Sequence, residues 1–308
     1  MVPRSAKPTA GAVGHRLRFS GHETFPFRYA WLPKGLRAIE GDPSVFSRED
    51  AIVTLGVGKN MAQSIQHWCE VLSLIRPRRR ADGYERTLLG TRLFGVHGWD
   101  PYLEDQGTLW LLHWLLVSYP ELASTWSLAF TKWNAEVFSG EELEAWILSM
   151  VPHGRRASRN SIHRDVEVFL RTYVPRGNGS DGPLEDTFDC PLVELGLIEE
   201  EGNGIYRFVR GPKPALPDAI FSFAVVDYWT RFSASQKSMS FETVLHGEAS
   251  PGAAFRLSES ALSDLLERLP SESGVSFDET AGLRQLLLKR AVERLDPMAI
   301  LEKHYEGR

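Results

Sequence analysis

The sequence predicts a mainly α-helical protein with an N-terminal winged helix-turn-helix, followed by a helical domain with small β-hairpins. Three features between residues 47 and 95 predict this class. They are a short helix that ends at a glycine turn, a longer helix with amide side chains on one face, and an arginine-rich segment typical of a hairpin. Their order along the chain is that of a winged-helix DNA-binding module.

The first helix is predicted over residues 47–55. Ser47 stands three residues before Asp50, a capping-box spacing in its weaker aspartate form, and Gly56 and Gly58 then end the helix. A second helix is predicted from Lys59. Its apolar residues recur at helical spacing: Ile65, Trp68, Cys69, Leu72 and Ile75.

The other face of this second helix is polar, with Asn60, Gln63, Ser64 and His67. Asparagine and glutamine can bond the Hoogsteen edge of adenine, and the N-terminal half of a recognition helix reaches the major groove. We therefore expect this face to read DNA through Lys59, Asn60, Gln63 and His67.

The arginine-rich segment is predicted to form the wing. Asp82-Gly83 is a dipeptide favoured in tight hairpin turns, and residues 84–89 form the returning strand. Residues 76–92 hold six arginines against Asp82 and Glu85. The arginines expected to contact phosphate are Arg76, Arg78, Arg79, Arg80 and Arg86. The alternative is a solvated charged loop after an ordinary core helix.

Composition indicates a globular protein but does not by itself indicate DNA. The 308 residues are 43% hydrophobic and 24% charged, and the net charge of −5 is unevenly distributed. Residues 181–201 hold eight carboxylates and no lysine or arginine. The two cysteines, Cys69 and Cys190, predict neither a disulfide framework nor a zinc ribbon, so we expect a reducing compartment, the cytoplasm.

Breakers and apolar periodicity predict four segments: a disordered tail over 1–18, the winged-helix domain over 19–99, a helical domain over 100–176, and a C-terminal helical domain with a β-hairpin over 177–308. Helices are predicted near 108–118, 121–132, 140–150, 159–173, 216–232, 258–269, 280–294 and 297–305. A short helix at 191–195 and a hairpin at 197–209 could form a degenerate second winged helix, but its acidic hairpin favours a packing role. No internal repeat is apparent. The longest apolar run, 109–117, is too short to cross a membrane, so no membrane partner is expected.

Nuclease signatures are absent from the sequence: no PD-(D/E)xK, HNH, GIY-YIG or zinc-finger spacing occurs. Phosphodiester cleavage usually needs a divalent metal held by carboxylates, and the best local supply is Asp100, Glu104 and Asp105. We expect these to hold Mg²⁺ or Mn²⁺, with Glu104 and Asp105 catalytic. The alternative is that they are favourable charges at the start of the following helix.

Two further polar segments could serve the reaction. His22 could act as a general base beside Glu23, with Arg28 stabilising charge on a phosphate; the alternative is a packed aromatic segment. Ahead of the helix over 159–173 stands a basic group expected to hold the DNA backbone, or else to be solvated: Arg155, Arg156 and Arg159.

Several long motifs resemble the SspB-like family of bacterial DNA phosphorothioation systems. They are residues 19–25 (FSGHETF) with Arg28, Trp31 and Leu32, residues 100–105 (DPYLED) leading into 108–114, residues 161–165 (SIHRD) with Tyr173, and residues 190–197. The resemblance covers most of residues 19–305. It implies a DNA nicking endonuclease that opens one strand of duplex DNA, so that partner proteins of the system replace a phosphate oxygen with sulfur in defence against phage. It identifies no catalytic residue.

A second function class fits the same sequence. A non-enzymatic winged-helix adaptor or transcription regulator would need the DNA-binding module but no nuclease motif. The C-terminal part also predicts a homodimer, because Leu283, Leu286, Leu287 and Arg290 follow helical spacing ahead of another helix with apolar residues. The alternative is that these residues complete the core of the monomer.

Overall fold

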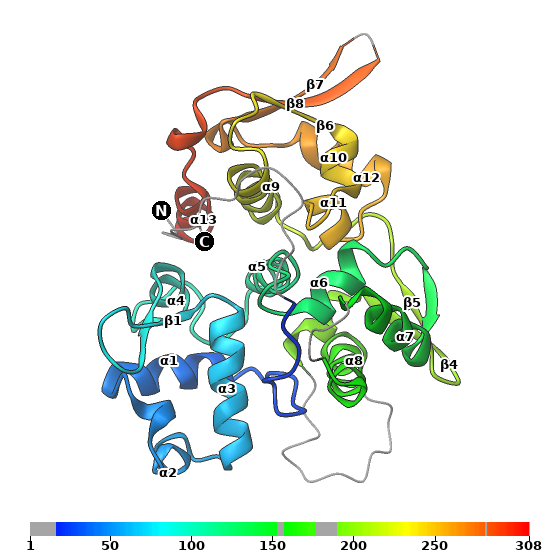
Figure 1. Ribbon diagram of the computed structural model, residues 1–308. Coiled ribbons are helices and arrows are strands. Elements are labelled where there is room, and N and C mark those ends of the chain that lie inside the picture. Colours follow the sequence, from blue (N-terminus) through cyan, green and yellow to red (C-terminus); the bar gives the residue numbers. More distant parts are fainter. Residues whose placement is uncertain (1–16, 153–156, 176–189, 281, 308) are drawn as a thin grey trace.

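The computed structural model describes residues 17–152, 157–175, 190–280 and 282–307. The protein is mainly helical with small antiparallel sheets, as the sequence predicts. Its elements form three groups around the central helix α5 (Gln106–Val117). In Figure 1 the first group is blue to cyan, the second is green to yellow-green, and the third is yellow to red. Because all eleven residues from Gly107 to Val117 are buried, α5 joins the three groups into one core.

The first group holds the predicted DNA-binding elements. Its helices are α1 (Trp31–Gly41), α2 (Ala51–Leu55), α3 (Lys59–Val71) and α4 (Leu88–Phe94), with a 3-10 turn at Val45–Ser47. Strands β1 (Ile75–Pro77) and β2 (Tyr84–Arg86) pair in an antiparallel hairpin. Gly56 ends α2 in the left-handed conformation at φ 61°, as the glycine turn predicts.

The second group combines helices with a three-stranded sheet. Its helices are α6 (Ser124–Thr131), α7 (Gly140–Met150) and α8 (Arg159–Tyr173). Its strands are β3 (Val137–Ser139), which lies between α6 and α7, and β4 (Ile198–Gly202) and β5 (Ile205–Phe208), which follow α8. The sheet has the order β3-β5-β4. Ser139 and Glu142 form a complete capping box at the start of α7. The predicted short helix before β4 is a 3-10 turn at Pro191–Leu195.

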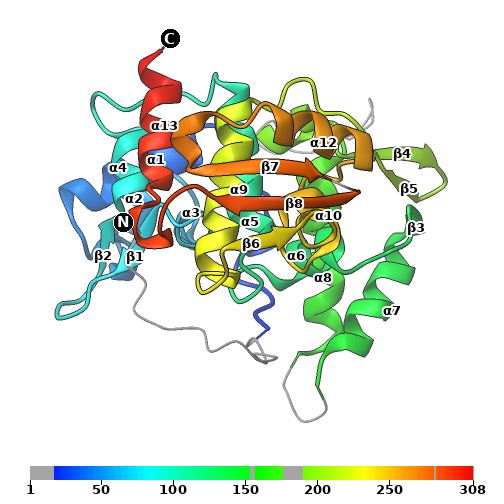
Figure 2. The ribbon, with the colours of Figure 1, turned by 90° about the horizontal axis from the view of Figure 1, so that it is seen from above.

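The third group is formed by the C-terminal part of the chain. It contains α9 (Asp218–Phe232), β6 (Ser238–Ser240), α10 (Phe241–His246), α11 (Pro251–Ala254), α12 (Glu259–Glu267), β7 (Val275–Thr280), β8 (Leu283–Leu288) and α13 (Pro297–Glu306), with 3-10 turns at Ser271–Ser273 and Val292–Arg294. The sheet has the order β6-β8-β7. Figure 2 shows this sheet lying over α9.

The predicted helix near 280–294 is wrong. Residues 283–288 form β8, which pairs with β7 from Thr280↔Leu283 to Val275↔Leu288. Gly282 at φ 78° supplies a left-handed turn residue that a continuous helix would exclude. Leu286 is fully buried while Leu283 is 59% exposed, so pairing and burial override the helical spacing of the leucines.

Several sequence predictions concern residues outside the described ranges. They are the tail up to residue 16, the linker at 177–183, and Arg155 and Arg156. The domain boundaries at 99/100 and 176/177 remain predictions. In the part of the chain that the structure describes, no helix combines the length and apolar character needed to cross a membrane.

Candidate nucleic-acid interface

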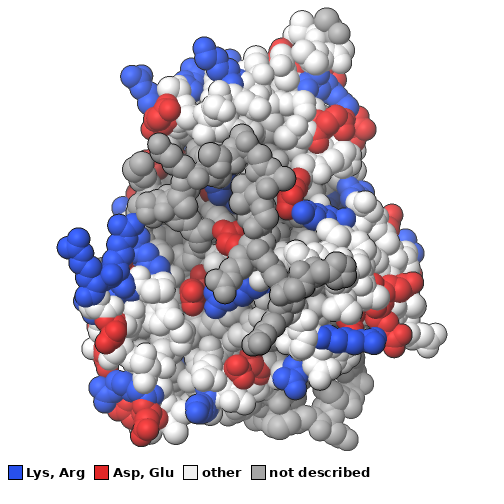
Figure 3. All heavy atoms as spheres, in the orientation of Figure 1, with Lys and Arg blue, Asp and Glu red and all other residues white. Residues whose placement is uncertain are grey.

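The β1–β2 hairpin presents arginine side chains to solvent. Arg78 at the end of β1 donates its backbone N–H to the Gly83 carbonyl at 3.0 Å, and Arg78, Arg79 and Arg80 are exposed. Gly83 has φ 90°, and an added Cβ would lie 2.1 Å from the Pro43 oxygen, so the turn requires glycine. Figure 3 shows lysine and arginine gathered at the left edge, over this hairpin.

Two of the predicted wing arginines have partners within the protein. Arg76 donates its Nε–H to Glu85 Oε1 at 2.6 Å across the hairpin. Arg86 donates to the Leu36 carbonyl at 3.3 Å and also pairs with Glu40, both on α1. The Arg86 side chain is only 14% exposed and fastens the hairpin to α1, and its contact with phosphate stays a prediction.

The N-terminal half of α3 is exposed as predicted. Lys59, Asn60 and Gln63 all lie on the surface, and Gly58 precedes them as the N-cap in an extended conformation. They follow directly from the turn after α2, so the amide side chains are presented beside the helix-turn-helix corner. This surface and the hairpin tip have the residue types expected of a DNA interface.

The predicted position of His67 on this free face is wrong. His67 is 6% exposed and packs against the N-terminal segment, with its ring 6.0 Å from that of His22. Burial, the nearby His22 and Arg18 lower the pKa of His67 to about 3, so the ring is neutral near pH 7. Ser64 is also buried, because its hydroxyl donates to the His22 carbonyl at 2.9 Å.

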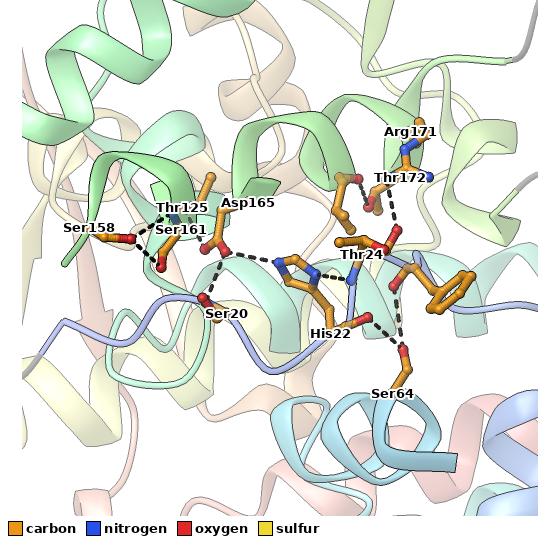
Figure 4. Close-up of polar contacts among 12 residues, drawn as sticks. Ser20, His22, Thr24, Ser64, Thr125, Ser158, Ser161, Asp165, Arg171 and Thr172 are labelled. Carbon is orange, nitrogen blue, oxygen red and sulfur yellow. Dashed lines mark hydrogen bonds and ion pairs between the residues drawn. The ribbon is translucent and has the colours of Figure 1, made fainter. Parts of the chain in front are cut away.

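His22 lies between α3 and α8 and bonds a carboxylate on α8. His22 Nε2 lies 2.9 Å from Asp165 Oδ1, and both side chains are nearly fully buried (Figure 4). The Thr24 backbone N–H donates to His22 Nδ1 at 3.1 Å, so Nδ1 is an acceptor and Nε2 carries the proton. With both ring nitrogens bonded, His22 has no free position to accept a proton from water.

Both oxygens of the Asp165 carboxylate accept hydrogen bonds. Oδ1 accepts the Ser20 backbone N–H at 2.8 Å, and Oδ2 accepts the Thr125 hydroxyl at 3.0 Å. Its three partners come from two separate parts of the chain, the N-terminal segment and α6. The arrangement therefore holds the N-terminal segment against the second group of helices.

Glu23 and Arg28, which were predicted to act with His22, have other surroundings. Glu23 is exposed and has φ 47°, in a segment where Ser20, Gly21 and Thr24 are also left-handed. The Arg28 guanidinium lies over the Trp31 ring at 5.1 Å. The geometry thus favours the alternative of a packed aromatic segment, and a catalytic role for His22 and Glu23 stays a prediction.

The acidic residues before α5 serve their own loop. Asp100 is buried, and its two oxygens accept the backbone N–H groups of Glu104 at 2.9 Å and Asp105 at 3.1 Å. Asp105 is the N-cap of α5 and accepts the Gly107 N–H at 2.6 Å. Glu104 is exposed.

This geometry does not fit the predicted metal site. Both oxygens of Asp100 and Oδ1 of Asp105 accept backbone N–H groups, which a cation at those atoms would have to displace, and Asp105 Oδ2 lies 3.9 Å from His304 Nε2. Within the described ranges, no group of three or more His, Cys, Asp and Glu side chains is arranged to hold a metal ion. In this structure Asp100 holds the loop and Asp105 caps α5, and the assignment of Asp100, Glu104 and Asp105 as metal ligands stays a prediction.

Arg159 lies on the surface at the start of α8. Its Nε–H donates to Glu144 Oε1 at 3.0 Å, and His163 Nδ1 lies 2.9 Å from Glu144 Oε2. Burial raises the pKa of Glu144, but the bonds from His163 and Arg159 outweigh it and leave that pKa below its usual value. The Arg159 side chain is 79% exposed, so it remains available at the surface.

Comparison with known proteins assigns the family. Residues 19–305 match a family described as "Protein of unknown function (DUF4007)". The chain belongs to the DUF4007 family. This DUF4007 protein is also similar to two solved structures, "Magnesium ion-bound SspB crystal structure" and "SspB crystal structure". Each has 31% sequence identity and a TM-score of 0.84, with 94% of this chain and 88% of the other covered. No match was found among curated proteins.

The SspB likeness confirms the resemblance seen in the sequence motifs. Several of those motifs lie together in this DUF4007 protein, because residues 19–25 and 161–165 meet at the His22–Asp165 bond. The sequence motifs include Asp165 at residues 161–165 but assign it no role. Its position between Ile162 and Val166, on the apolar face of α8, was the signal that it is buried and needs a partner.

Proposed function

We propose that this chain binds duplex DNA through its first group of elements and nicks one strand, within a phosphorothioate-modification and phage-defence system. The observation that carries the proposal is the similarity to SspB over 94% of the chain. It is supported by the arginine tip of the β1–β2 hairpin and the exposed amides of α3, which together suit a winged helix on DNA.

Binding is proposed to be mainly electrostatic at the hairpin and base-specific at α3. Arg78, Arg79 and Arg80 neutralise phosphates and release counterions, so they contribute to affinity for every duplex. Asn60 and Gln63 bond base edges in the major groove and discriminate among sequences. Other proteins of the modification system are the proposed partners on nicked DNA.

The binding half of the proposal is tested with matched charge-removal variants. Replacing Arg78 and Arg80 with alanine should weaken binding to all duplexes and lower the salt slope by up to about 0.9 for each phosphate that is no longer neutralised. The control removes two exposed cations from the third group, Lys289 and Arg294. Equal effects in the two variants, measured by fluorescence anisotropy across a salt series, would refute a specific role for the hairpin.

The nicking half is tested on supercoiled plasmid with Mg²⁺, Mn²⁺ or chelator. A divalent-metal requirement is part of the proposal, and one SspB structure contains magnesium, but Asp100, Glu104 and Asp105 are not proposed as its ligands. Asparagine is a good N-cap, so Asp105→Asn should keep both the fold and nicking. Loss of nicking in a folded Asp105→Asn variant would restore a catalytic role to this carboxylate.

A second candidate is a non-enzymatic DNA-binding adaptor or regulator. The observation that favours it is that His22, Asp100 and Asp105, the predicted reactive groups, are engaged in bonds within the fold. Duplex binding without relaxation of supercoiled plasmid, with system partners present as well as absent, would select the adaptor.

A further inference from the structure

The three groups of elements repeat one topology. In the second group a helix (α6) leads to a strand (β3), two helices (α7, α8) and a hairpin (β4–β5), and the first strand pairs with the last in the order β3-β5-β4. The third group repeats this from α9 to β8 with one additional short helix, α11, between α10 and α12, and its sheet has the order β6-β8-β7. We refer to these stretches, residues 124–208 and 218–288, as the second and third units.

The first unit, residues 31–86, has the same plan with a reduced first strand. Its elements run from α1 through α2 and α3 to the β1–β2 hairpin. In place of a full first strand, the Pro43 carbonyl accepts the Tyr84 N–H of β2 at 2.8 Å. Strand β2 therefore lies between residue 43 and β1, as β5 lies between β3 and β4. The helices that directly precede the three hairpins, α3, α8 and α12, are thus equivalent.

Burial at two positions of these helices agrees with the equivalence. With a constant offset of 100 residues, Ala62, Ile162 and Leu262 are all buried. The same holds one turn later for Ile65, Asp165 and Leu265. The first residues of the three helices can therefore be compared, although further along Ser64 is buried where Arg164 is exposed.

Their outward residues differ in charge. Helix α3 begins with Lys59 and Asn60, and α8 begins with Arg159 and Asn160, a repeated basic–asparagine pair. Helix α12 begins instead with Glu259 and Ser260. The second unit thus repeats the DNA-binding chemistry proposed for the first, while a carboxylate takes the place of the cation in the third.

Residues of α8 beyond its first turn extend this basic surface. His163, equivalent to Gln63, and Arg164 are exposed, and the 9%-exposed Glu144 carboxylate holds both Arg159 and His163 in place. A carboxylate of such low exposure orients the Arg159 guanidinium and the His163 ring beside Asn160. Side chains that bind a ligand are more effective when a neighbouring group fixes their orientation, as Glu144 on α7 does here.

We propose that α8 is a second DNA-reading helix, which contacts duplex DNA through Asn160 and Arg164, with Arg159 beside them. The inference rests on the proposed DNA binding of the first unit. The hairpin of the second unit carries Glu199, Glu200 and Glu201, all exposed, so this unit contacts DNA through its helix and not through its hairpin.

Site-directed photocrosslinking tests the proposal on the full chain. Both native cysteines, Cys69 and Cys190, are buried, so a photoreactive label directs itself to an introduced surface thiol. Asn160→Cys should crosslink to duplex DNA, as should Asn60→Cys. The matched control, Ser260→Cys on α12, should not. Crosslinking from residue 60 alone would overturn the second site and leave the proposed function intact.

Affinity measurements give an independent result. Asn160→Ala with Arg164→Ala should lower affinity for the preferred duplex by about 5- to 150-fold, the range for removal of one base-reading pair. The salt slope should fall by up to about 0.9 because one phosphate is no longer neutralised. Ser260→Ala with Asp264→Ala should not weaken binding. Unchanged affinity in the α8 variant refutes the inference, and absence of duplex binding by the parent protein refutes it together with the proposed function.

Discussion

His22 and Asp165 are 143 positions apart in sequence and lie 2.9 Å apart in the fold, with the His22 Nε2–H donating to the carboxylate. The bond joins the left-handed segment around Gly21 to α8, and α3 closes the other side through the Ser64 hydroxyl. The segment therefore couples the first and second units, the two that are proposed to contact DNA.

Removal of the Asp165 carboxylate should destabilise the protein strongly. Asp165→Ala leaves the His22 N–H, the Ser20 N–H and the Thr125 hydroxyl without an acceptor, and breaking such a buried pair costs about 3–5 kcal/mol. Urea unfolding measures the change in stability. The exposed Glu167 on the same helix is the control, and Glu167→Ala should change stability by less than about 0.5 kcal/mol. A stable Asp165→Ala protein that cannot nick DNA would contradict the structural role.

Gly21 should not tolerate a side chain. An added Cβ would lie 2.5 Å from His67 Nδ1, and Gly21 has φ 104°, so Gly21→Ala combines backbone strain with a clash against a buried ring. We expect stability to fall by about 2 kcal/mol or more. Gly41 at the end of α1 has open space around its Cβ position, and Gly41→Ala should be neutral or stabilising. Thermal unfolding of the two variants compares them directly, and equal midpoints would refute the close packing at Gly21.

Acid should destabilise the fold through buried neutral histidines. His113 lies within 2.8 Å of both the Tyr173 hydroxyl and the Ala254 carbonyl, and burial is the largest cause that lowers its pKa to about 3. The unfolded chain binds a proton near the ordinary pKa of 6.5. Stability from this group is therefore complete above that pH and lost as pH falls from about 6.5 towards 3, with a slope approaching about 1.4 kcal/mol per pH unit.

Unfolding free energies measured at pH 7, 6 and 5 test whether stability falls with acid as predicted. His113→Leu should be less stable at pH 7 but should show a shallower decline with acid, because one of the protons taken up on unfolding is removed. His97 is exposed, so His97→Leu should keep the parent slope. An unaltered slope in His113→Leu would show that this ring is not buried in its neutral form.

Arg86 and Arg80 should separate stability from DNA affinity. Arg86→Ala removes bonds to the Leu36 carbonyl and Glu40 and should cost about 1.5–3 kcal/mol of stability. Arg80→Ala at the exposed hairpin tip should leave stability within about 0.5 kcal/mol and lower the salt slope of DNA binding. Chemical denaturation and anisotropy on both variants distinguish the roles; a stable Arg86→Ala protein would return this arginine to the set of phosphate contacts.

The predicted homodimer remains a prediction, now placed on the β7–β8 hairpin. Leu283 is 59% exposed at the start of β8, so it can contribute to an interface, whereas Leu286 belongs to the core. Light scattering across a concentration series should give twice the 34.7 kDa monomer mass, and Leu283→Lys should restore the monomer. A constant monomer mass in the parent protein would contradict the prediction.

The sequence alone determined the elements whose causes are local. The helix at 159–173 follows from amphipathic spacing, and the β1–β2 turn follows from Asp82-Gly83, whose glycine adopts a left-handed conformation. The exposure of Lys59, Asn60 and Gln63 was likewise predicted, because the apolar residues of α3 fix which face packs.

Only the tertiary structure decided which polar residues are buried and with what partners. His67 and Ser64 shared the polar side of a helical wheel with Asn60, yet the N-terminal segment covers them. Asp100 and Asp105 had the composition of a metal site, but their oxygens bond backbone N–H groups of their own loop. Residues 283–288 had the spacing of a helix, but strand β7 provides a better partner. Local periodicity reports interactions over a few residues, whereas hydrogen-bond satisfaction depends on groups that only the folded chain brings together.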